Sequence, residues 1–344
     1  MKRKRGGINA GRSNWEYVFS PAARARLNAL LDFDEEAIPK RDFVDGETAL
    51  GATPSTQSLE GAKIIVATWG AHPLTEALLR SCPDLELVVY AAGSVKGLVT
   101  PAFVAREIPI CSAVHLNARP VAEFVFGLVL LSLKDLFGFN RSLRRLGPTG
   151  WNFDMRGFTG GAYGTTVGLL GYGRVTSELL PRLRTLDINI LLEDPHLSAQ
   201  EIRELGAEPA GVEEIMRRAD VVSLHHGDTV PNRGMIGAKE LELLRPESHF
   251  INTARGRLVD EAALVERLRR GDITAYLDVT YPEPPPEGHP FYSLENCILT
   301  PHIAGSLGRE TYRMGDYAVR EVEHWLKGQP LENQLDLNEV EYRA

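Results

Sequence analysis

Three short stretches in the last third of the chain carry residues that can do chemistry together. Arg255 lies in the sequence Asn-Thr-Ala-Arg-Gly, Glu283 lies in a proline-rich run, and His302 lies in the sequence Thr-Pro-His-Ile-Ala-Gly. Each stretch begins where a short apolar run meets a turn of Gly, Pro or Asp. In α/β sheets such positions are the carboxyl ends of strands, where ligands bind. We therefore expect the three side chains to share one site.

These side chains suit the reversible reduction of a 2-keto acid. Arg255 offers a planar fork that holds the substrate carboxylate and carbonyl oxygen, and it stabilises the charge that develops on that oxygen. His302 gives this oxygen a proton during reduction and takes it back during oxidation. Glu283 beside it favours the imidazolium form. A nicotinamide would supply the hydride, so no nucleophile or metal is required.

Each of the three residues also has a purely structural interpretation. Arg255 alone suits a surface ion pair, Glu283 a loop carboxylate and His302 a strand-end cap. Their shared context at strand ends favours the catalytic interpretation.

A candidate cofactor loop lies upstream, between an apolar run at 166–170 and a helical stretch at 174–186. The first glycine of such a loop permits a tight turn, and the second lets a pyrophosphate approach the backbone at a helix N-terminus. Thr176 replaces the third glycine, which governs packing of the helix on the strand. We therefore expect a slightly shifted helix and retained binding. The residues expected to contact the cofactor here are Gly171, Tyr172, Gly173, Arg174 and Val175.

Asp194 follows the next predicted strand, about 20 residues after the loop, as in dinucleotide-binding units. A carboxylate there accepts hydrogen bonds from the adenosine ribose and repels a 2′-phosphate. Pro195 and His196 follow, without an arginine or lysine on that turn. The sequence therefore predicts NAD over NADP. The alternative is that Asp194 caps a helix and the glycines are only turn residues.

Composition narrows the class of protein. A chain of 344 residues exceeds what one core usually serves, so we expect two domains. A net charge of −8 argues against a nucleic-acid surface, and we see no apolar run of the roughly 20 residues that span a bilayer. The first residues are basic and rich in glycine, which predicts a disordered tail over 1–14. The alternative is an arm that binds nucleic acid or a membrane surface.

The cysteines and paired histidines suggest neither disulfides nor a metal site. Cys82, Cys111 and Cys297 show no metal-binding spacing, so we expect reduced thiols in a cytoplasmic protein. His225 and His226 are adjacent at a strand end, where their side chains diverge, and no third ligand has suitable spacing.

The pattern of apolar runs predicts parallel sheets. Strands are expected at 62–67 and 87–90, with a helix at 74–79 between them. A second, doubly wound set has six strands, and residues 307–327 suggest an amphipathic helix. The expected strands of that set are 166–170, 189–192, 220–224, 248–251, 275–277 and 298–299, alternating with helices at 174–186, 211–218, 237–244 and 260–270. Residues 121–137 predict a helix that is apolar on nearly all sides, either buried in a core or joining domains or subunits.

The chain resembles the D-isomer-specific 2-hydroxyacid dehydrogenases from about residue 60 to 335. The motifs that carry the resemblance are Gly171-Tyr172-Gly173, Asp194-Pro195, Leu224-His225, Asn252–Glu261, Asp278-Val279 with Glu283-Pro284, and Thr300–Gly305. The resemblance implies two Rossmann-like or flavodoxin-like α/β domains flanking a cleft, with the NAD domain inserted in the substrate domain. The implied division is a tail at 1–14, a substrate domain at 15–118 plus 303–336, an NAD domain at 119–302 and a tail at 337–344. It also implies a homodimer through the helix at 121–137.

The resemblance also assigns roles residue by residue. It places the catalytic arginine, glutamate and histidine on Arg255, Glu283 and His302. Further cofactor contacts are expected from His225, Thr253, Ala254 and Asp278, the last at the nicotinamide end. Substrate contacts are expected from Trp69, Gly93, Ser94 and Val95, together with Arg255 and His302. Trp69 is alternatively a core residue.

One departure from the family bears on the substrate. Lys96-Gly97 stand where the family usually has Asp-Asn. Lys96 either attracts a second anionic group of the substrate or points to solvent.

The function expected from the sequence is hydride transfer between NAD(H) and a D-2-hydroxy acid or its 2-keto partner. The alternative is an NADH-sensing corepressor of the same fold, which can keep all three catalytic residues. Formate oxidation moves no hydroxyl proton, so the His302–Glu283 arrangement argues against it.

Overall fold

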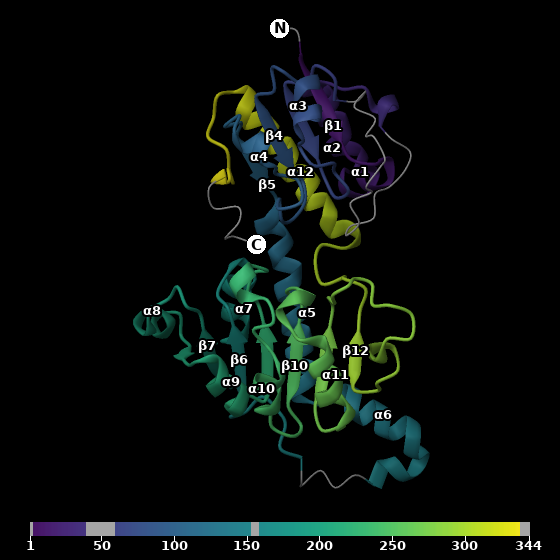
Figure 1. Ribbon diagram of the computed structural model, residues 1–344, viewed down its shortest axis with the longest axis vertical. Coiled ribbons are helices and arrows are strands. Elements are labelled where there is room, and N and C mark those ends of the chain that lie inside the picture. The colour runs from purple at the N-terminus through teal and green to yellow at the C-terminus, as the bar shows by residue number, and fades with distance from the viewer. Residues whose placement is uncertain (1–2, 39–58, 153–157, 338–344) are drawn as a thin grey trace. The chain divides into compact units, whose positions relative to one another are not determined.

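A computed structural model describes residues 3–38, 59–152 and 158–337. The chain divides into two compact units (Figure 1). Residues 1–118 and 306–344 form what we call the terminal unit, and residues 119–305 form the central unit. The predicted tail at 337–344 lies almost wholly outside the described residues.

The terminal unit is built on a five-stranded parallel sheet in the order β2-β1-β3-β4-β5. This is the flavodoxin-like order. Its strands are β1 (Lys4–Asn9), β2 (Leu31–Asp32), β3 (Ile64–Ala67), β4 (Leu87–Tyr90) and β5 (Ile110–Ser112). Apolar side chains of α1 (Arg12–Val18), α2 (Pro21–Leu30) and α12 (Thr311–Leu326) form one core with the sheet. Those of α3 (Glu76–Ser81) and α4 (Pro101–Val104) form another.

The predicted disordered tail over 1–14 is wrong, because Lys4–Asn9 is strand β1 near the middle of this sheet. Its glycines are needed for packing. A Cβ at Gly6 would lie 2.6 Å from the Phe33 ring, and one at Gly7 would lie 2.8 Å from the Ala62 Cβ. The basic residues lie at the start of the strand, where Lys4 pairs with Glu86. The composition of residues 1–14 predicts disorder, whereas Gly6 and Gly7 are required in β1 because neighbouring side chains pack closely against their backbone.

The central unit holds a seven-stranded parallel sheet in the order β12-β11-β10-β9-β6-β7-β8. This is the doubly wound dinucleotide-binding order, extended by one strand. The strands are β6 (Thr166–Leu170), β7 (Asn189–Glu193), β8 (Glu208–Pro209), β9 (Val221–Leu224), β10 (His249–Asn252), β11 (Thr274–Leu277) and β12 (Cys297–Leu299). The helices are α5 (Val114–Leu133), which enters from the terminal unit, α6 (Leu136–Leu146), α7 (Arg174–Leu183), α8 (Ala199–Glu204), α9 (Val212–Arg218), α10 (Ala238–Glu242) and α11 (Glu261–Arg269).

The predicted doubly wound fold is confirmed, and all six predicted strands of the central sheet are present. The seventh, β8, was missed because it is an edge strand of two residues, one of them a proline. The predicted helix at 307–327 is α12, which begins a few residues later. Two core clusters of apolar side chains pack about this sheet.

The long apolar helix differs from its prediction at 121–137. It begins earlier, at Val114, and ends at Leu133. Asp135 then adopts a left-handed conformation with φ of 42°, and α6 begins at the next residue. The left-handed residue breaks the helix, a break that the apolar pattern does not reveal.

By length and composition alone α5 could cross a membrane, which corrects the expectation that no run is long enough. Its mean hydropathy is 1.5, and half of the segment is buried inside the protein. Ala122, Val125 and Val129 pack into a core of the central unit. These contacts are those of a core helix.

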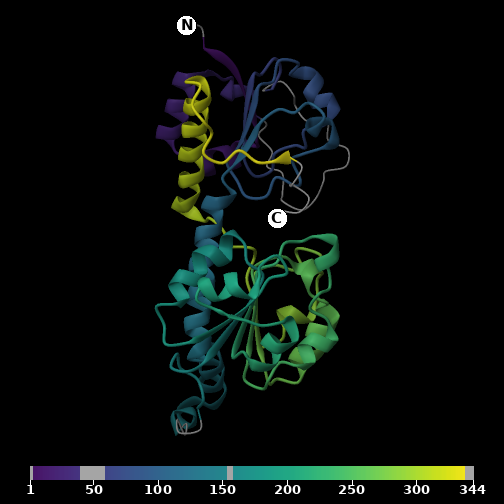
Figure 2. The ribbon, with the colours of Figure 1, turned by 90° about the vertical axis from the view of Figure 1, so that its left-hand side faces the viewer.

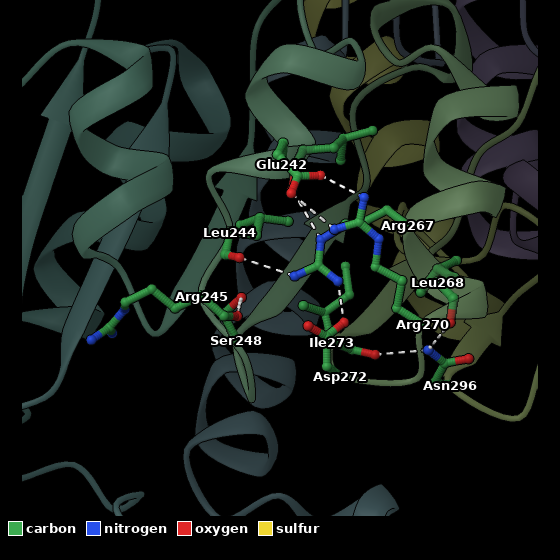
Figure 3. A network of polar contacts seen from close by, with 11 residues as sticks. Glu242, Leu244, Arg245, Ser248, Arg267, Leu268, Arg270, Asp272, Ile273 and Asn296 are labelled. Carbon is green, nitrogen blue, oxygen red and sulfur yellow. Dashed lines mark hydrogen bonds and ion pairs between the residues drawn. The ribbon is translucent and has the colours of Figure 1, made fainter.

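A buried arginine joins two helices of the central unit (Figure 3). Arg267 of α11, with a side chain only 4% exposed, pairs with Asp272. It also donates to the carbonyls of Leu241 at 3.1 Å and Leu244 at 3.0 Å. Leu241 lies in α10 and its carbonyl also accepts from the Leu244 amide, whereas Leu244 lies two residues beyond the end of the helix. The arginine therefore ties α10 to α11.

We expect Arg267→Ala to lower the free energy of unfolding by about 2–4 kcal/mol, because Asp272 and both carbonyls lose their donor. Denaturant unfolding followed by circular dichroism measures this loss. Arg269→Ala is the control, since Arg269 lies on the same helix in an exposed pair with Glu266 and should cost less than about 1 kcal/mol. An equal decrease in the free energy of unfolding in the two variants would contradict the conclusion that Arg267 ties α10 to α11.

Candidate active site

His302 and Glu283 form a direct pair at the carboxyl end of the central sheet. The His302 Nδ1 atom lies 2.6 Å from Glu283 Oε1. The Glu283 hydrogen bond raises the pKa of His302; burial opposes this, the Glu283 charge adds to it, and the Arg255 charge lowers it. The two residues follow the neighbouring strands β11 and β12. The structure thus brings together the predicted acid–base pair, with Arg255 near enough to act on it.

The backbone at His302 is held in an unusual conformation. Its φ is 55°, which is uncommon for a residue other than glycine. The Asp278 carboxylate, 3% exposed, supports the turn. Its oxygens accept hydrogen bonds from Thr300 Oγ1 at 2.6 Å and from the amides of Ile303 and Ala304 at 2.8 Å. Asp278 therefore supports the turn that carries His302, while its predicted contact with nicotinamide stays a prediction.

Arg255 is exposed and follows β10, the strand beside β11. The buried Asn252 side chain shapes this loop by accepting from Ala254 N and donating to Arg255 O, each at 3.0 Å. The Arg255 Nη1 atom donates to the Ala254 carbonyl at 2.6 Å. Sequence reasoning assigned no role to Asn252, although it is the first residue of the motif that contains Arg255.

The cofactor loop follows β6 and opens α7. Gly171 has φ of 100°, and a Cβ there would lie 2.8 Å from the His226 amide nitrogen. A Cβ at Gly173 would meet no atom within 4 Å, so the backbone there faces open space. Thr176 is fully buried, and its hydroxyl donates to the Gly171 carbonyl at 2.7 Å. Thr176 therefore stabilises the turn with a side-chain hydrogen bond that a glycine at this position could not make.

Asp194 lies just beyond β7 and contacts this loop. Its Oδ2 accepts from the Tyr172 amide at 2.7 Å and its Oδ1 from the His196 amide at 2.8 Å. The helix-cap alternative fails, because α7 begins after Gly173 and α8 is capped by Ser198. The loop also includes Arg174 and Val175, the first residues of α7 and both half-buried. The ribose contact stays a prediction.

Two buried polar atoms at neighbouring strand ends fit a bound dinucleotide. His225 Nε2 and Thr253 Oγ1 have no hydrogen-bond partner within the part of the chain that the structure describes. Burial lowers the pKa of His225 to about 3, so its ring is neutral near pH 7. Buried polar groups are normally hydrogen-bonded. Together with the open backbone at Gly173, these two atoms suit a polar ligand. Ala254, which follows Thr253 in the sequence, is half-buried.

The neighbouring His226 has a protein partner. Its Nε2 lies 2.6 Å from Glu193 Oε2, and both side chains are largely buried. Among residues 3–38, 59–152 and 158–337, no group of three or more His, Cys, Asp or Glu is arranged to hold a metal ion.

The predicted substrate residues lie in the terminal unit, after β3 and β4. Trp69 is half-buried and packs against both cores of that unit, in agreement with the core-packing alternative. Val95 is 5% exposed, so its side chain belongs to the core. The Gly93 carbonyl accepts from Ser112 Oγ at 2.7 Å, and Ser94 Oγ accepts from the Lys96 amide at 3.4 Å. Ser94 and Lys96 are half-buried, and the substrate contacts expected from this loop stay predictions.

Comparison with known proteins identifies a family for this chain. The family model described as "D-isomer specific 2-hydroxyacid dehydrogenase, NAD binding domain" matches residues 126–304. The D-3-phosphoglycerate dehydrogenase of Methanocaldococcus jannaschii is 27% identical over 298 residues, which are 86% of this chain and 56% of that protein. The glycerate dehydrogenase of Methylorubrum extorquens is 30% identical over 284 residues, 80% of this chain and 86% of that protein.

The chain therefore spans little more than half the length of the first of these relatives. Among solved structures, the apo form of D-mandelate dehydrogenase from Rhodotorula graminis has a TM-score of 0.78 at 20% identity. The match covers 97% of this chain and 98% of that one. It shows a shared fold.

We expect Glu283→Gln to lower the pKa of His302, because the hydrogen bond to the carboxylate is the main cause of its rise. Since that pKa is raised, the imidazolium is stabilised up to a higher pH than usual, and the variant should lose its proton earlier as pH rises. NMR titration of the histidine rings, with His302→Gln to assign the signal, measures this. If the pKa of His302 is the same in the variant, Glu283 does not raise it and the proposed role of Glu283 is wrong.

Proposed function

Because the chain belongs to the D-isomer specific 2-hydroxyacid dehydrogenase family, we propose that it transfers a hydride between NAD(H) and a D-2-hydroxy acid or its 2-keto partner. The observation that carries this proposal is the 2.6 Å contact between His302 and Glu283, with the Arg255 charge acting on the same histidine. A carboxylate-paired histidine beside a guanidinium moves a proton at an oxygen next to an anionic group.

Each residue has a definite part in the reduction. The Arg255 guanidinium binds the substrate carboxylate and stabilises negative charge on the carbonyl oxygen. His302 donates its Nε2 proton to that oxygen, since Nδ1 faces Glu283. Glu283 keeps the ring protonated and oriented. Bound NADH supplies the hydride.

The residues that would hold the cofactor come from four strand ends of the central unit. The Gly171 and Tyr172 amides donate to Glu193 O and Asp194 Oδ2, so the amides of Gly173 and of the start of α7 are those that would bind a pyrophosphate. Asp194 would accept from the adenosine ribose and repel a 2′-phosphate, which favours NADH over NADPH. His225 Nε2 and Thr253 Oγ1 are the buried polar atoms that a bound dinucleotide can satisfy.

The substrate class we propose is a small 2-keto acid. The names of the relatives support it, since they act as phosphoglycerate and glycerate dehydrogenases. A relative from Aeropyrum pernix, a glyoxylate reductase, points the same way.

We expect purified protein to oxidise NADH with at least one member of a keto-acid panel, and to use NADPH much less well. The panel holds glyoxylate, pyruvate, hydroxypyruvate, phenylpyruvate, a branched-chain keto acid and oxaloacetate. Arg255→Ala and His302→Ala should each lower kcat/KM by about 10²–10⁴-fold, because each removes a group that acts in the transition state. NADH absorbance measures turnover.

Arg217→Ala is the matched control, since Arg217 lies on α9 in an exposed pair with Glu213. Activity equal in all variants would contradict the proposed roles. Tight NADH binding without turnover on any keto acid would instead favour the NADH-sensing corepressor.

We also propose the homodimer expected through residues 121–137, a segment that the structure divides between α5 and the start of α6, and we extend its interface along α6. None of the α6 side chains is buried, although several are apolar. Leu136 is 47% exposed and Leu146 49% exposed, and Trp151 beyond them is 79% exposed. Both ribbon views show α6 extending past the sheet of the central unit (Figures 1 and 2). An apolar helix face of this kind suits burial against a second copy.

We expect the double variant Leu136→Lys and Leu146→Lys to run at the monomer mass in light scattering after gel filtration, because two charges would enter the apolar contact. The unchanged protein should run at the dimer mass. A monomer in both cases, at micromolar concentration, would exclude this interface.

A further inference from the structure

Tyr281 lies two residues before Glu283 and is held by the segment that carries Arg255. This segment continues from Arg255 through a 3-10 turn, Gly256–Leu258, to Glu261 at the start of α11. Three of its residues contact Tyr281 or the peptide before it. We call these residues, Gly256, Arg257 and Glu261, the clamp.

The clamp holds the backbone of Tyr281 at two points. A Cβ at Gly256 would lie 2.1 Å from the Thr280 carbonyl carbon and 2.5 Å from the Tyr281 nitrogen, so only glycine lets the two backbones meet. The Tyr281 amide donates to Glu261 Oε1 at 2.6 Å. Twenty residues separate this donor from its acceptor. The contact is therefore a tertiary link between two loops of the site.

The clamp also holds the Tyr281 side chain. The Arg257 guanidinium lies 4.2 Å from the ring centroid, and its Nη2 donates to the tyrosine hydroxyl at 3.1 Å. The tyrosine is 54% exposed, so the arginine, and not a core, fixes its position. A guanidinium stacked on an aromatic face adds cation–π attraction to the hydrogen bond.

The link runs between the two catalytic loops. Arg255 directly precedes Gly256, and Glu283 follows Tyr281 after one proline. Burial raises the pKa of Glu261 to about 7, although the hydrogen bond from the Tyr281 amide lowers it, and the Glu283 charge adds to the rise. The charges that act on His302 are those of Glu283, Arg255 and Asp278. Glu261 is not one of these groups, so we expect it to act on His302 through the position of the loop that carries Glu283.

We propose that Glu261 and Arg257 are positioning residues, which fix Glu283 against His302 by clamping Tyr281. The consequence for turnover rests on the proposed dehydrogenase function, whereas the consequence for the His302 ring does not. Without the clamp, the proline-rich loop gains freedom and the hydrogen bond from Glu283 to His302 weakens.

The first experiment measures the pKa of His302 by NMR in the full-length protein. We expect Glu261→Ala to lower it by about 0.5–1 unit, because the hydrogen bond is the main support of the imidazolium. Glu261→Gln keeps an acceptor for the Tyr281 amide and should restore a pKa near that of the unchanged protein. In the Glu283→Gln background, Glu261→Ala should have no further effect.

Two outcomes would overturn the proposal. One is an unchanged pKa of His302 in folded Glu261→Ala. The other is an equal decrease in both backgrounds, since that would show an action that bypasses Glu283. Arg257→Met tests the same clamp through a half-buried side chain and should lower the pKa as well. Arg269→Met, an exposed arginine of α11, is the matched control and should leave it unchanged.

The second experiment uses the keto acid that turns over best. Glu261→Ala should lower kcat/KM about 10-fold and move the alkaline limb of its pH profile to lower pH, because a misplaced Glu283 no longer holds the imidazolium. The Kd for NADH should stay the same. An equal loss at all pH values would point to general damage and overturn the proposal. If no keto acid turns over, the NMR result still decides for or against the clamp.

Discussion

The arrangement of the site depends on one buried carboxylate. Asp278 lies at the end of β11 and accepts three hydrogen bonds from the turn that carries His302, including two backbone amides. The turn needs this support, because His302 has a positive φ that a residue with a Cβ rarely adopts. Once the turn is fixed, Nδ1 of His302 meets Glu283 at 2.6 Å. The contact between His302 and Glu283 therefore depends on a buried hydrogen-bond acceptor, Asp278.

The parallel sheet explains why residues far apart in sequence meet. Because β10, β11 and β12 are adjacent and parallel, the loops that follow them lie at one edge. Arg255, Glu283 and His302 each occupy one of these loops. The cofactor loop follows β6, and the order of connections reverses between β6 and β9. Such a reversal is where doubly wound sheets bind ligands, so the proposed catalytic residues and the proposed cofactor residues belong to one edge of one unit.

Much of this was predictable from the sequence, and the failures have physical causes. Strands of the central sheet are continuous apolar runs between turn residues, and Arg255, Glu283 and His302 lie in the loops that follow three of them. Strand β1 was missed because its glycines and basic residues resemble a solvated tail, whereas its neighbours on the sheet require the small residues. The break at Asp135 and the short edge strand β8 leave no periodic signal. The supporting roles of Asn252, Glu261 and Asp278 depend on partners that only the folded chain brings near.

The exposure of the acid–base pair determines how it can be tuned. The His302 side chain is 49% exposed and that of Glu283 is 40% exposed, so solvent screens distant charges. The pKa of His302 is raised first by the direct hydrogen bond, whose strength depends steeply on distance and angle. In a half-exposed pair, geometry therefore matters more than net charge. This explains why both partners are supported from behind, His302 by Asp278 and the Glu283 loop by contacts of Tyr281 with Arg257 and Glu261.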